Sequence, residues 1–218
     1  MHDLNKNPRI DVFNAKIVDG AYFSSHYEFP LIKPTYFKPI VAIDFNTAKR
    51  TKKYDQWVHF YMHDYIFECL WNNPEKYLPL LKKFRGVITP DYSLFRNMPL
   101  VMQIWNTYRN RAIAYWLQNN GINIVTNIRW GDFRSYDFAF EGLEKGGSYA
   151  IGSHGCIQDK TDRFYFIEGL IKMVEVLQPE TIINYSYYSK DIFDEYKEKG
   201  IEIITLIHWS DAGKIGSE

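Results

Sequence analysis

The chain has 218 residues, and its 26 Lys and Arg side chains are balanced by 26 Asp and Glu, which gives a formal net charge of zero. This balance excludes the strongly basic composition typical of non-specific duplex binding, while a local basic patch stays compatible with it. Hydrophobic residues make up 46% of the chain and aromatic residues 17%, enough for a sizeable core and for ring-lined pockets or an interface.

The cysteine count and the hydropathy of the chain indicate the cellular compartment. Cys69 and Cys156 are too few for a disulfide scaffold. Apolar runs stay well below the ~18 residues of a membrane-spanning helix, and the first residues lack the apolar core of a signal peptide. We therefore expect a cytoplasmic protein that makes no contact with a membrane.

The apolar pattern predicts strands that alternate with helices. We expect an irregular, aromatic-rich arm over residues 1–35, a single α/β domain over 36–210 and a flexible tail over 211–218. In chain order, strands are expected at 39–45, 57–61, 86–91, 122–128, 148–151, 181–185 and 201–207. Helices are expected from the cap Asn73-Pro74 onward and at 98–119, 161–177 and 191–199, with a short helix in 129–140. Gly121 suits the left-handed position after the long helix.

This rhythm defines the fold class. Near-continuous apolar strands separated by helices are typical of a parallel sheet covered on both faces. We therefore predict an α/β protein with a mostly parallel sheet, either an incomplete TIM-like barrel or an open doubly wound sheet. The chain is shorter than the roughly 250 residues of a full eightfold barrel.

In such folds ligands bind at the carboxyl ends of the strands. Those ends are rich in polar side chains, which are costly to bury without partners. The alternative is that strands simply leave a sheet through polar residues. Candidates for this rim include Asp44, Asp64, Asp91, Asn127, Arg129, Asp132, Ser153, His154, Asn184 and His208.

The turn at residues 152–156 carries two alternative readings. Its flanking glycines would let backbone N–H groups converge on an anion at the start of the next helix, although an ordinary tight turn is the better explanation for them. Cys156 would be a nucleophile if His154 or His208 served as its base; otherwise it is a buried, inert thiol.

Four aspartates suggest a site for a hard cation. Asp44, Asp64, Asp91 and Asp132 follow different strands, and carboxylates of this kind bind Mg²⁺ or Mn²⁺. Acidic residues also cap helices and turns, which is the competing explanation. A closed zinc site is excluded by the cysteine count and the histidine spacing.

Two arginines, Arg109 and Arg111, lie within the long helix close to its apolar rows. Either guanidinium would clamp a carboxylate or phosphate, or form a structural ion pair with an acid on a neighbouring element.

Residues 89–132 contain T-P-D, N-x-Y-R-N-R and R-W-G-D, and a Gly-Ser turn follows at 152–153. On these motifs the chain, over about residues 35–209, resembles the family catalogued as domain of unknown function 4417, found in bacteria, phages and integrated mobile elements. The resemblance implies a mobile-element context, with the host-cell cytoplasm as its setting, and no established activity. By motif match it adds Trp130 to Asp91, Arg109, Arg111, Arg129, Asp132 and Ser153 as candidates.

Two hypotheses follow. The first is a hydrolase or phosphodiesterase that acts on a nucleotide or nucleic-acid phosphate, with Mg²⁺ or Mn²⁺ as candidate cofactor. The second is a non-enzymatic module that binds a host protein or self-assembles, because aromatic rings are favoured interface anchors. For the enzyme, the catalytic candidates are Asp91, Asp132 and His154, the metal ligands Asp44 and Asp64, and the substrate-binding residues Arg109, Arg111, Arg129, Trp130, Ser153, Asn184 and His208.

Overall fold

The computed structural model describes residues 11, 13–153, 155–186 and 188–208. The strands are β1 (Val41–Asp44), β2 (Trp57–His59), β3 (Gly86–Ile88), β4 (Ile124–Asn127), β5 (Ser148–Gly152), β6 (Thr181–Tyr185), β7 (Glu202–Thr205) and β8 (Ile207–His208). The helices are α1 (Phe45–Ala48), α2 (Asp64–Asn72), α3 (Pro74–Leu81), α4 (Leu100–Asn119), α5 (Lys160–Leu177) and α6 (Lys190–Glu198), with short 3-10 turns η1 (Ala15–Val18) and η2 (Phe133–Ser135).

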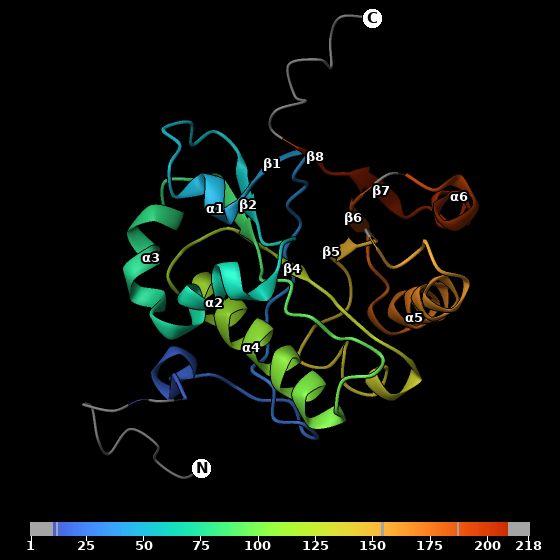
Figure 1. Cartoon of the computed structure of the whole chain (residues 1–218), viewed down its shortest axis with the longest axis horizontal. Coiled ribbons are helices and arrows are strands. Elements are labelled where there is room, and N and C mark those ends of the chain that lie inside the picture. The colour runs from blue at the N-terminus through green and yellow to red at the C-terminus, as the bar shows by residue number, and fades with distance from the viewer. Residues whose placement is uncertain (1–10, 12, 154, 187, 209–218) are drawn as a thin grey trace, which may run out of the picture.

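All the strand pairs in the described sheet are parallel, in the order β7-β6-β5-β4-β3-β2-β1-β8. Only Leu206 separates β7 from β8, so one extended segment pairs with β6 through its first half and with β1 through its second. The sheet therefore curls around until its last strand returns to its first (Figure 1). With seven strand positions instead of eight, this is an incomplete TIM-like barrel, and of the two predicted architectures it is the first.

Side-chain alternation along the strands separates an inner from an outer layer. A cluster of buried residues contains one member from each strand position and fills the inside of the curl: Ala42, Trp57, Ile88, Val125, Ala150, Ile183 and Leu206. Their chain neighbours point outward into two other clusters. A Cβ on Gly86 would lie 2.4 Å from the Trp57 ring, so the indole fills the inside of the barrel only because its strand neighbour is glycine.

The helices cover the outer face in two groups. Ile43, Val58, Val87 and Ile124 pack into the cluster shared with α2, α3 and α4, whereas Ile182 packs into the cluster shared with α5 and α6. Figure 1 shows α1–α4 on one side of the molecule and α5–α6 on the other. None of the helices in the described part of the chain combines the length and apolar character needed to cross a bilayer.

The N-terminal arm is tied to the domain along its described length. It runs beneath α4 before rising into β1 (Figure 1). Lys33 exchanges two hydrogen bonds with Gln118 of α4, at 3.2 and 3.1 Å, and the Thr35 carbonyl accepts a 2.6 Å bond from the Ser148 amide. Phe29 and Ile32 are buried. The arm thus adds to the core in spite of its irregular backbone.

The predicted elements are largely confirmed, with three corrections. Helix α2 was not predicted, although Phe67, Leu70 and Trp71 have the spacing of a buried helical face. The chain enters the one-turn helix α1 at Phe45, because the Asp44 carboxylate accepts the Thr47 amide as an N-cap. Residues 129–140 form the 3-10 turn η2 and further turns instead of an α-helix. Gly121 has the expected positive φ, 75°.

Candidate functional site

A polar layer lies above the apolar inner layer, at the carboxyl ends of the strands. Because side chains two positions apart share a face, the residues that follow the inner cluster by twos point the same way, and Asp91 joins them through its contacts with Asn127 and Arg129. We call this set the mouth: Asp44, His59, Tyr61, Asp91, Asn127, Arg129, Gly152 and Tyr185. Partly buried Tyr61 and Tyr185 pack directly on the inner apolar cluster, which confirms that they lie inside the barrel.

An acidic and a basic side chain, Asp91 and Arg129, form the centre of the mouth. Arg129 Nη1 lies 3.5 Å from Asp91 Oδ2, and their side chains are only 20% and 13% exposed. Asn127 donates to Asp91 Oδ1 at 2.8 Å, and Tyr61 donates to Asn127 Oδ1 at 2.9 Å. Arg129 also donates to the Gly152 carbonyl at 3.3 Å, yet its buried Nε has no acceptor among the described residues. The guanidinium therefore keeps donor capacity for a ligand.

Aromatic rings line the mouth beside this pair. Tyr61 and Tyr185 are stacked, with ring centroids 4.3 Å apart and planes within 9°. His59 lies 4.9 Å from Tyr185 by ring centroids, and its Nδ1 accepts the Tyr61 amide at 3.3 Å. A flat ligand would find both a ring surface and a guanidinium within one small region.

Burial sets the electrostatics of the mouth. It raises the pKa of Asp91, even though Arg129 and the Asn127 hydrogen bond act in the opposite direction. The Asp91 carboxylate in turn raises the pKa of Arg129, which stays charged. Burial also raises the pKa of the Cys156 thiol, opposed by Arg129, so a resident thiolate is disfavoured. The raised pKa makes Asp91 a better proton acceptor than an exposed aspartate.

Arg129 also lines two hollows in the surface. One lies between α4 and the ends of β3 and β4 and has room for about one water molecule. The other, equally small, lies between β4, β5 and α5, against Gly152, Cys156 and Trp130.

The two arginines of α4 have structural partners. Arg109 Nη1 bonds both oxygens of Glu68, at 2.7 and 2.8 Å, and its guanidinium lies 4.0 Å from the centroid of the Tyr92 ring. Arg111 is 1% exposed and donates to the carbonyls of Ala139 and Glu141 and to the Asn110 side chain. Arg109 thus forms the ion pair that the sequence left open, and Arg111 ties α4 to the segment before β5.

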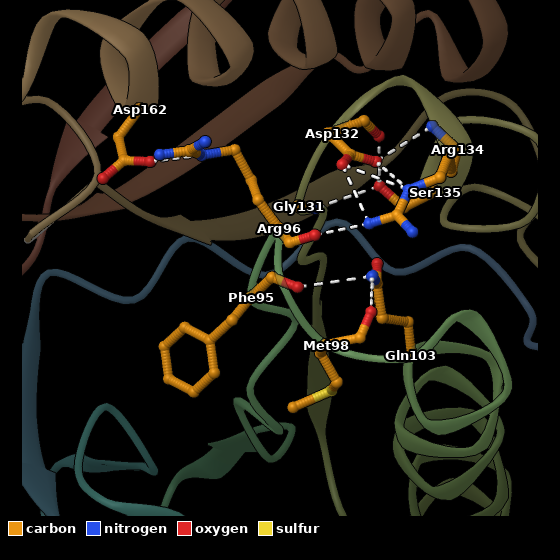
Figure 2. Close-up of polar contacts among 9 residues, drawn as sticks. All are labelled: Phe95, Arg96, Met98, Gln103, Gly131, Asp132, Arg134, Ser135 and Asp162. Carbon is orange, nitrogen blue, oxygen red and sulfur yellow. Dashed lines mark hydrogen bonds and ion pairs between the residues drawn. The ribbon is translucent and has the colours of Figure 1, made fainter.

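Asp132 and Trp130 lie outside the mouth. Figure 2 shows the Asp132 carboxylate accepting from the backbone N–H of Arg134, at 3.1 Å, and from its guanidinium, which also reaches the Arg96 carbonyl. Asp132 therefore organises the loop that contains η2. The Trp130 ring is 7% exposed and stacks on Phe166 in the outer core. A catalytic role for Asp132 and ligand binding by Trp130 stay predictions.

The remaining acidic candidates bond to nearby loops. Asp44 caps α1 through the Thr47 amide, at 2.9 Å. Asp64 accepts from the Ser93 amide at 3.1 Å and from its hydroxyl at 2.8 Å. Within the described ranges, no three His, Cys, Asp or Glu side chains lie together as a set of metal ligands. The four aspartates thus do not converge there as the sequence suggested.

Ser153 and Asn184 are both fully buried. The Ser153 hydroxyl has no partner among the described residues, while its amide donates to the Tyr185 carbonyl. Asn184 shares the outer face of β6 with Ile182, so it faces the helices and not the mouth. His154 lies outside the described residues, and of His208 the structure describes only the backbone, which pairs with Ala42.

The mouth includes side chains that were not among the predicted site residues. His59, Tyr61 and Tyr185 were read as parts of strands, and Asn127 was a candidate for the rim to which no specific role was assigned. Side chains alternate between the inside and the outside of the barrel along each strand, so the face of every residue is known once the inner apolar residue of its strand is known. Counting by twos from Trp57, Val125 and Ile183 would have identified all four.

Fold and site together define an α/β barrel protein with a buried Asp–Arg pair and stacked aromatic rings at the carboxyl ends of its strands. The chain belongs to the family described as Domain of unknown function (DUF4417), whose model matches residues 21–208. The match confirms the family expected from the sequence and begins within the arm, earlier than residue 35.

Two curated relatives are phage proteins. The Gene 1 protein of Mycobacterium phage L5 is 35% identical over 181 residues, covering 81% of this chain and 78% of that protein. The Gene 1 protein of Mycobacterium phage D29 is 34% identical over 182 residues, covering 81% of this chain and 66% of that protein. No solved structure matches. The chain is therefore of a phage type, in agreement with the expected mobile-element context.

Proposed function

We propose that the protein binds a nucleotide, or the phosphate of a nucleic acid, in the mouth of the barrel and hydrolyses a phosphate ester there. One observation carries the proposal: a buried Asp91–Arg129 pair lies beside the stacked Tyr61 and Tyr185 rings at the carboxyl end of a parallel barrel. A phosphate and a base are the two groups of a nucleotide that a guanidinium and an aromatic ring recognise.

Each mouth residue has a role in this proposal. Arg129 holds a phosphate oxygen through its unpartnered Nε and so stabilises charge that develops during cleavage. Tyr61 and Tyr185 contact the base. Asn127 positions the Asp91 carboxylate by its 2.8 Å hydrogen bond.

The proposed reaction is attack of water on phosphorus. Asp91 takes one proton from the water, whose oxygen forms the new P–O bond, and the ester P–O bond breaks with the electron pair leaving on the alcohol oxygen. A proton from solvent completes the alcohol product. Because burial raises the pKa of Asp91, its carboxylate is a stronger base than an exposed aspartate. Mg²⁺ or Mn²⁺ remains the candidate cofactor, because such ions often use one or two carboxylates plus substrate phosphates.

The test combines binding with turnover. Purified protein is screened by thermal shift against nucleoside mono-, di- and triphosphates, each with Mg²⁺, with Mn²⁺ and with EDTA. Labelled single-stranded oligonucleotides and inorganic phosphate release report cleavage. We expect Asp91→Asn to abolish turnover and Arg129→Gln to weaken binding. Arg163→Gln is the matched control, because it removes an Arg–Asp pair between α5 and α6 that includes none of the mouth residues. Turnover that survives in Asp91→Asn would refute the proposed base.

A second candidate function is supported by a separate surface. Several large apolar side chains around the start of α4 and the neighbouring loops are 38–69% exposed: Phe95, Leu100, Val101, Met102, Trp105 and Phe133. Exposed patches of this composition favour protein interfaces. Light scattering and a pull-down with the parent and with Val101→Asp test a host-protein partner or self-assembly. A monomer that retains no host protein counts against this function.

A further inference from the structure

The mouth contains a chain of hydrogen bonds that begins at Tyr61 and ends at Asp91. The Tyr61 hydroxyl donates to Asn127 Oδ1 at 2.9 Å, and Asn127 Nδ2 donates to Asp91 Oδ1 at 2.8 Å. Both bonds run in one direction, from the hydroxyl toward the carboxylate. The proposed reaction uses the Asp91 carboxylate and the Tyr61 ring, and it leaves the Tyr61 hydroxyl without a role.

The Asn127 amide sets which protonation state of Asp91 is favoured. In the described orientation its N–H group faces Asp91 and stabilises the carboxylate, because a hydrogen bond to the charged form favours that form. If the amide were reversed, its oxygen would face Asp91 and would accept a hydrogen bond only from the protonated acid. Reversal would also take away the acceptor of the Tyr61 hydroxyl, which bonds to no other described residue. The hydroxyl therefore opposes reversal.

Packing fixes the position of the Tyr61 hydroxyl. The Tyr61 ring is stacked on Tyr185, with centroids 4.3 Å apart. A Cβ added at Gly152 would lie 3.0 Å from Tyr61 Cε1, so the ring also lies directly against the backbone of β5. Gly152 and Tyr185 are partners in the β5–β6 pairing, and these two strands together support the ring. Burial raises the pKa of Tyr61 well above its usual value, so the hydroxyl keeps its hydrogen while Asp91 titrates.

The charged and titratable groups around Asp91 come from different elements of the mouth: Asp64, Arg129, Tyr61 and Cys156, with His59 beyond them against the Tyr185 ring. Arg129 favours the Asp91 carboxylate, and the charge of Asp64 disfavours it. Among these groups in the described part of the chain, Tyr61 is the one that hydrogen bonds to the Asn127 side chain. Its effect on Asp91 is therefore separable from direct charge effects.

We infer that Tyr61 is a positioning residue for Asp91. Its hydroxyl fixes the orientation of the Asn127 amide, and the amide N–H then keeps Asp91 as the carboxylate that accepts a proton. As a contribution to catalysis this role rests on the proposed function, whereas the effect on Asp91 itself needs no substrate. The ring that contacts the base in the proposal and the hydroxyl that orients the proton acceptor thus belong to one side chain.

The quantity to measure is the pKa of Asp91, in the whole protein without a ligand. Carbon-13 NMR of Asp-labelled protein follows the carboxyl signals with pH, and Asp91→Asn identifies the signal of Asp91. Tyr61→Phe keeps the ring but removes the hydroxyl, so the amide is free to reverse when Asp91 takes up a proton. We expect the pKa of Asp91 to rise by about 0.5 or more in this variant.

Two further variants show whether the effect passes through Asn127. In an Asn127→Ala background, Tyr61→Phe should leave the pKa of Asp91 unchanged, because the connecting amide is gone. Tyr185→Phe is the matched control, since it removes a hydroxyl from the other ring of the same stack, and its Asp91 pKa should match the parent. An Asp91 pKa that is the same in Tyr61→Phe and the parent overturns the inference, as does an equal rise in Tyr185→Phe or in the Asn127→Ala background.

The parent alone gives a second test, which decides if Tyr61→Phe does not fold. The signal of the Asn127 side-chain amide should change with pH in step with the Asp91 carboxyl, and an amide signal that stays constant overturns the inference.

Turnover separates this inference from the proposed function. The acid limb of the pH–rate profile should move to higher pH in Tyr61→Phe, because it follows the pKa of the proton acceptor. Turnover that survives in Asp91→Asn refutes the proposed base alone. An Asp91 pKa that Tyr61→Phe leaves unchanged refutes the positioning role alone.

Discussion

Substituting Gly169 by Ala tests how tightly the outer core is packed around Trp130. Gly169 lies in the interior of α5, where alanine is favoured over glycine by about 1 kcal/mol. Propensity alone would therefore make Gly169→Ala stabilising. The structure predicts the opposite, because a Cβ at this position would lie 2.2 Å from Trp130 Nε1.

The magnitude follows from what holds the indole. Its ring is 7% exposed, stacks on Phe166 with centroids 5.5 Å apart and contacts Phe140 at 6.0 Å. Normal contact would require a movement of more than about 1 Å into occupied space. Overpacking of this kind costs about 1–3 kcal/mol and more when relief is blocked. We expect a net loss of about 1–2 kcal/mol, or a melting temperature lower by about 2–8 °C.

Urea unfolding of four proteins measures the effect: the parent, Gly169→Ala, Trp130→Phe and the double variant. The smaller ring of Trp130→Phe removes the contact, so the added methyl group should cost less, or even stabilise, in that background. A coupling energy above about 0.5 kcal/mol is expected for residues in contact. The reasoning is refuted if Gly169→Ala is as stable as the parent, or if the two changes are additive.

Three further outcomes are expected. Burial raises the folded-state pKa of Asp91, so this residue favours folding at pH values below its unfolded pKa of about 4, and the contribution is lost as pH rises through the folded pKa. The unfolding free energy of the parent minus that of Asp91→Asn should therefore fall between acid and neutral pH. A rise would contradict the direction of the pKa shift. Arg109→Lys loses the hydrogen bonds to both Glu68 oxygens and should lower the free energy of unfolding in urea by about 1–2 kcal/mol. Arg163→Lys, at a partly exposed ion pair, should lower it by less than about 0.5 kcal/mol. Equal losses in the two variants would count against this argument. Asp159→Ala removes the N-cap of α5 and should lower the melting temperature at neutral pH. Hydrogen bonds from the Asp162 and Thr161 amides lower the pKa of Asp159, so the difference in melting temperature between parent and variant should shrink as pH falls through the folded pKa. A difference that stays constant with pH would argue against this role of Asp159.

Most of the fold follows from local pattern. Strand β6 has the predicted bounds, 181–185, because a short run centred on Ile182 and Ile183 stands between Pro179 and Ser186. The segment after β4 does not follow, since its turns are fixed by side chains from elsewhere, such as Arg111 binding the Ala139 and Glu141 carbonyls. No periodicity within 129–140 carries that information.

Part of the candidate site was also predictable from the position of its residues relative to the strands. Asp91 and Arg129 are found by their place after strands, because any parallel barrel brings such residues to one end. Ring residues such as Tyr61 and Tyr185 require the inner face of each strand to be known first. Asp132 and Arg109 are polar candidates as well, yet each has its own ion-pair partner, Arg134 and Glu68 respectively. Only the coordinates distinguish polar residues whose hydrogen bonds stabilise the fold from polar residues that keep hydrogen-bond donors for a ligand.

The segment spanning β7 and β8 has a consequence for biosynthesis. While the chain emerges from the ribosome, β1 lacks its neighbour on one side until residues 207–208 have been made, so one sheet edge stays open to other nascent chains. Ring closure is then the contact of longest sequence separation and should come late in folding. Any change that weakens the pairing of Val41 and Ala42 with this final segment should show first as poor yield during expression, before it appears as reduced stability in the purified protein.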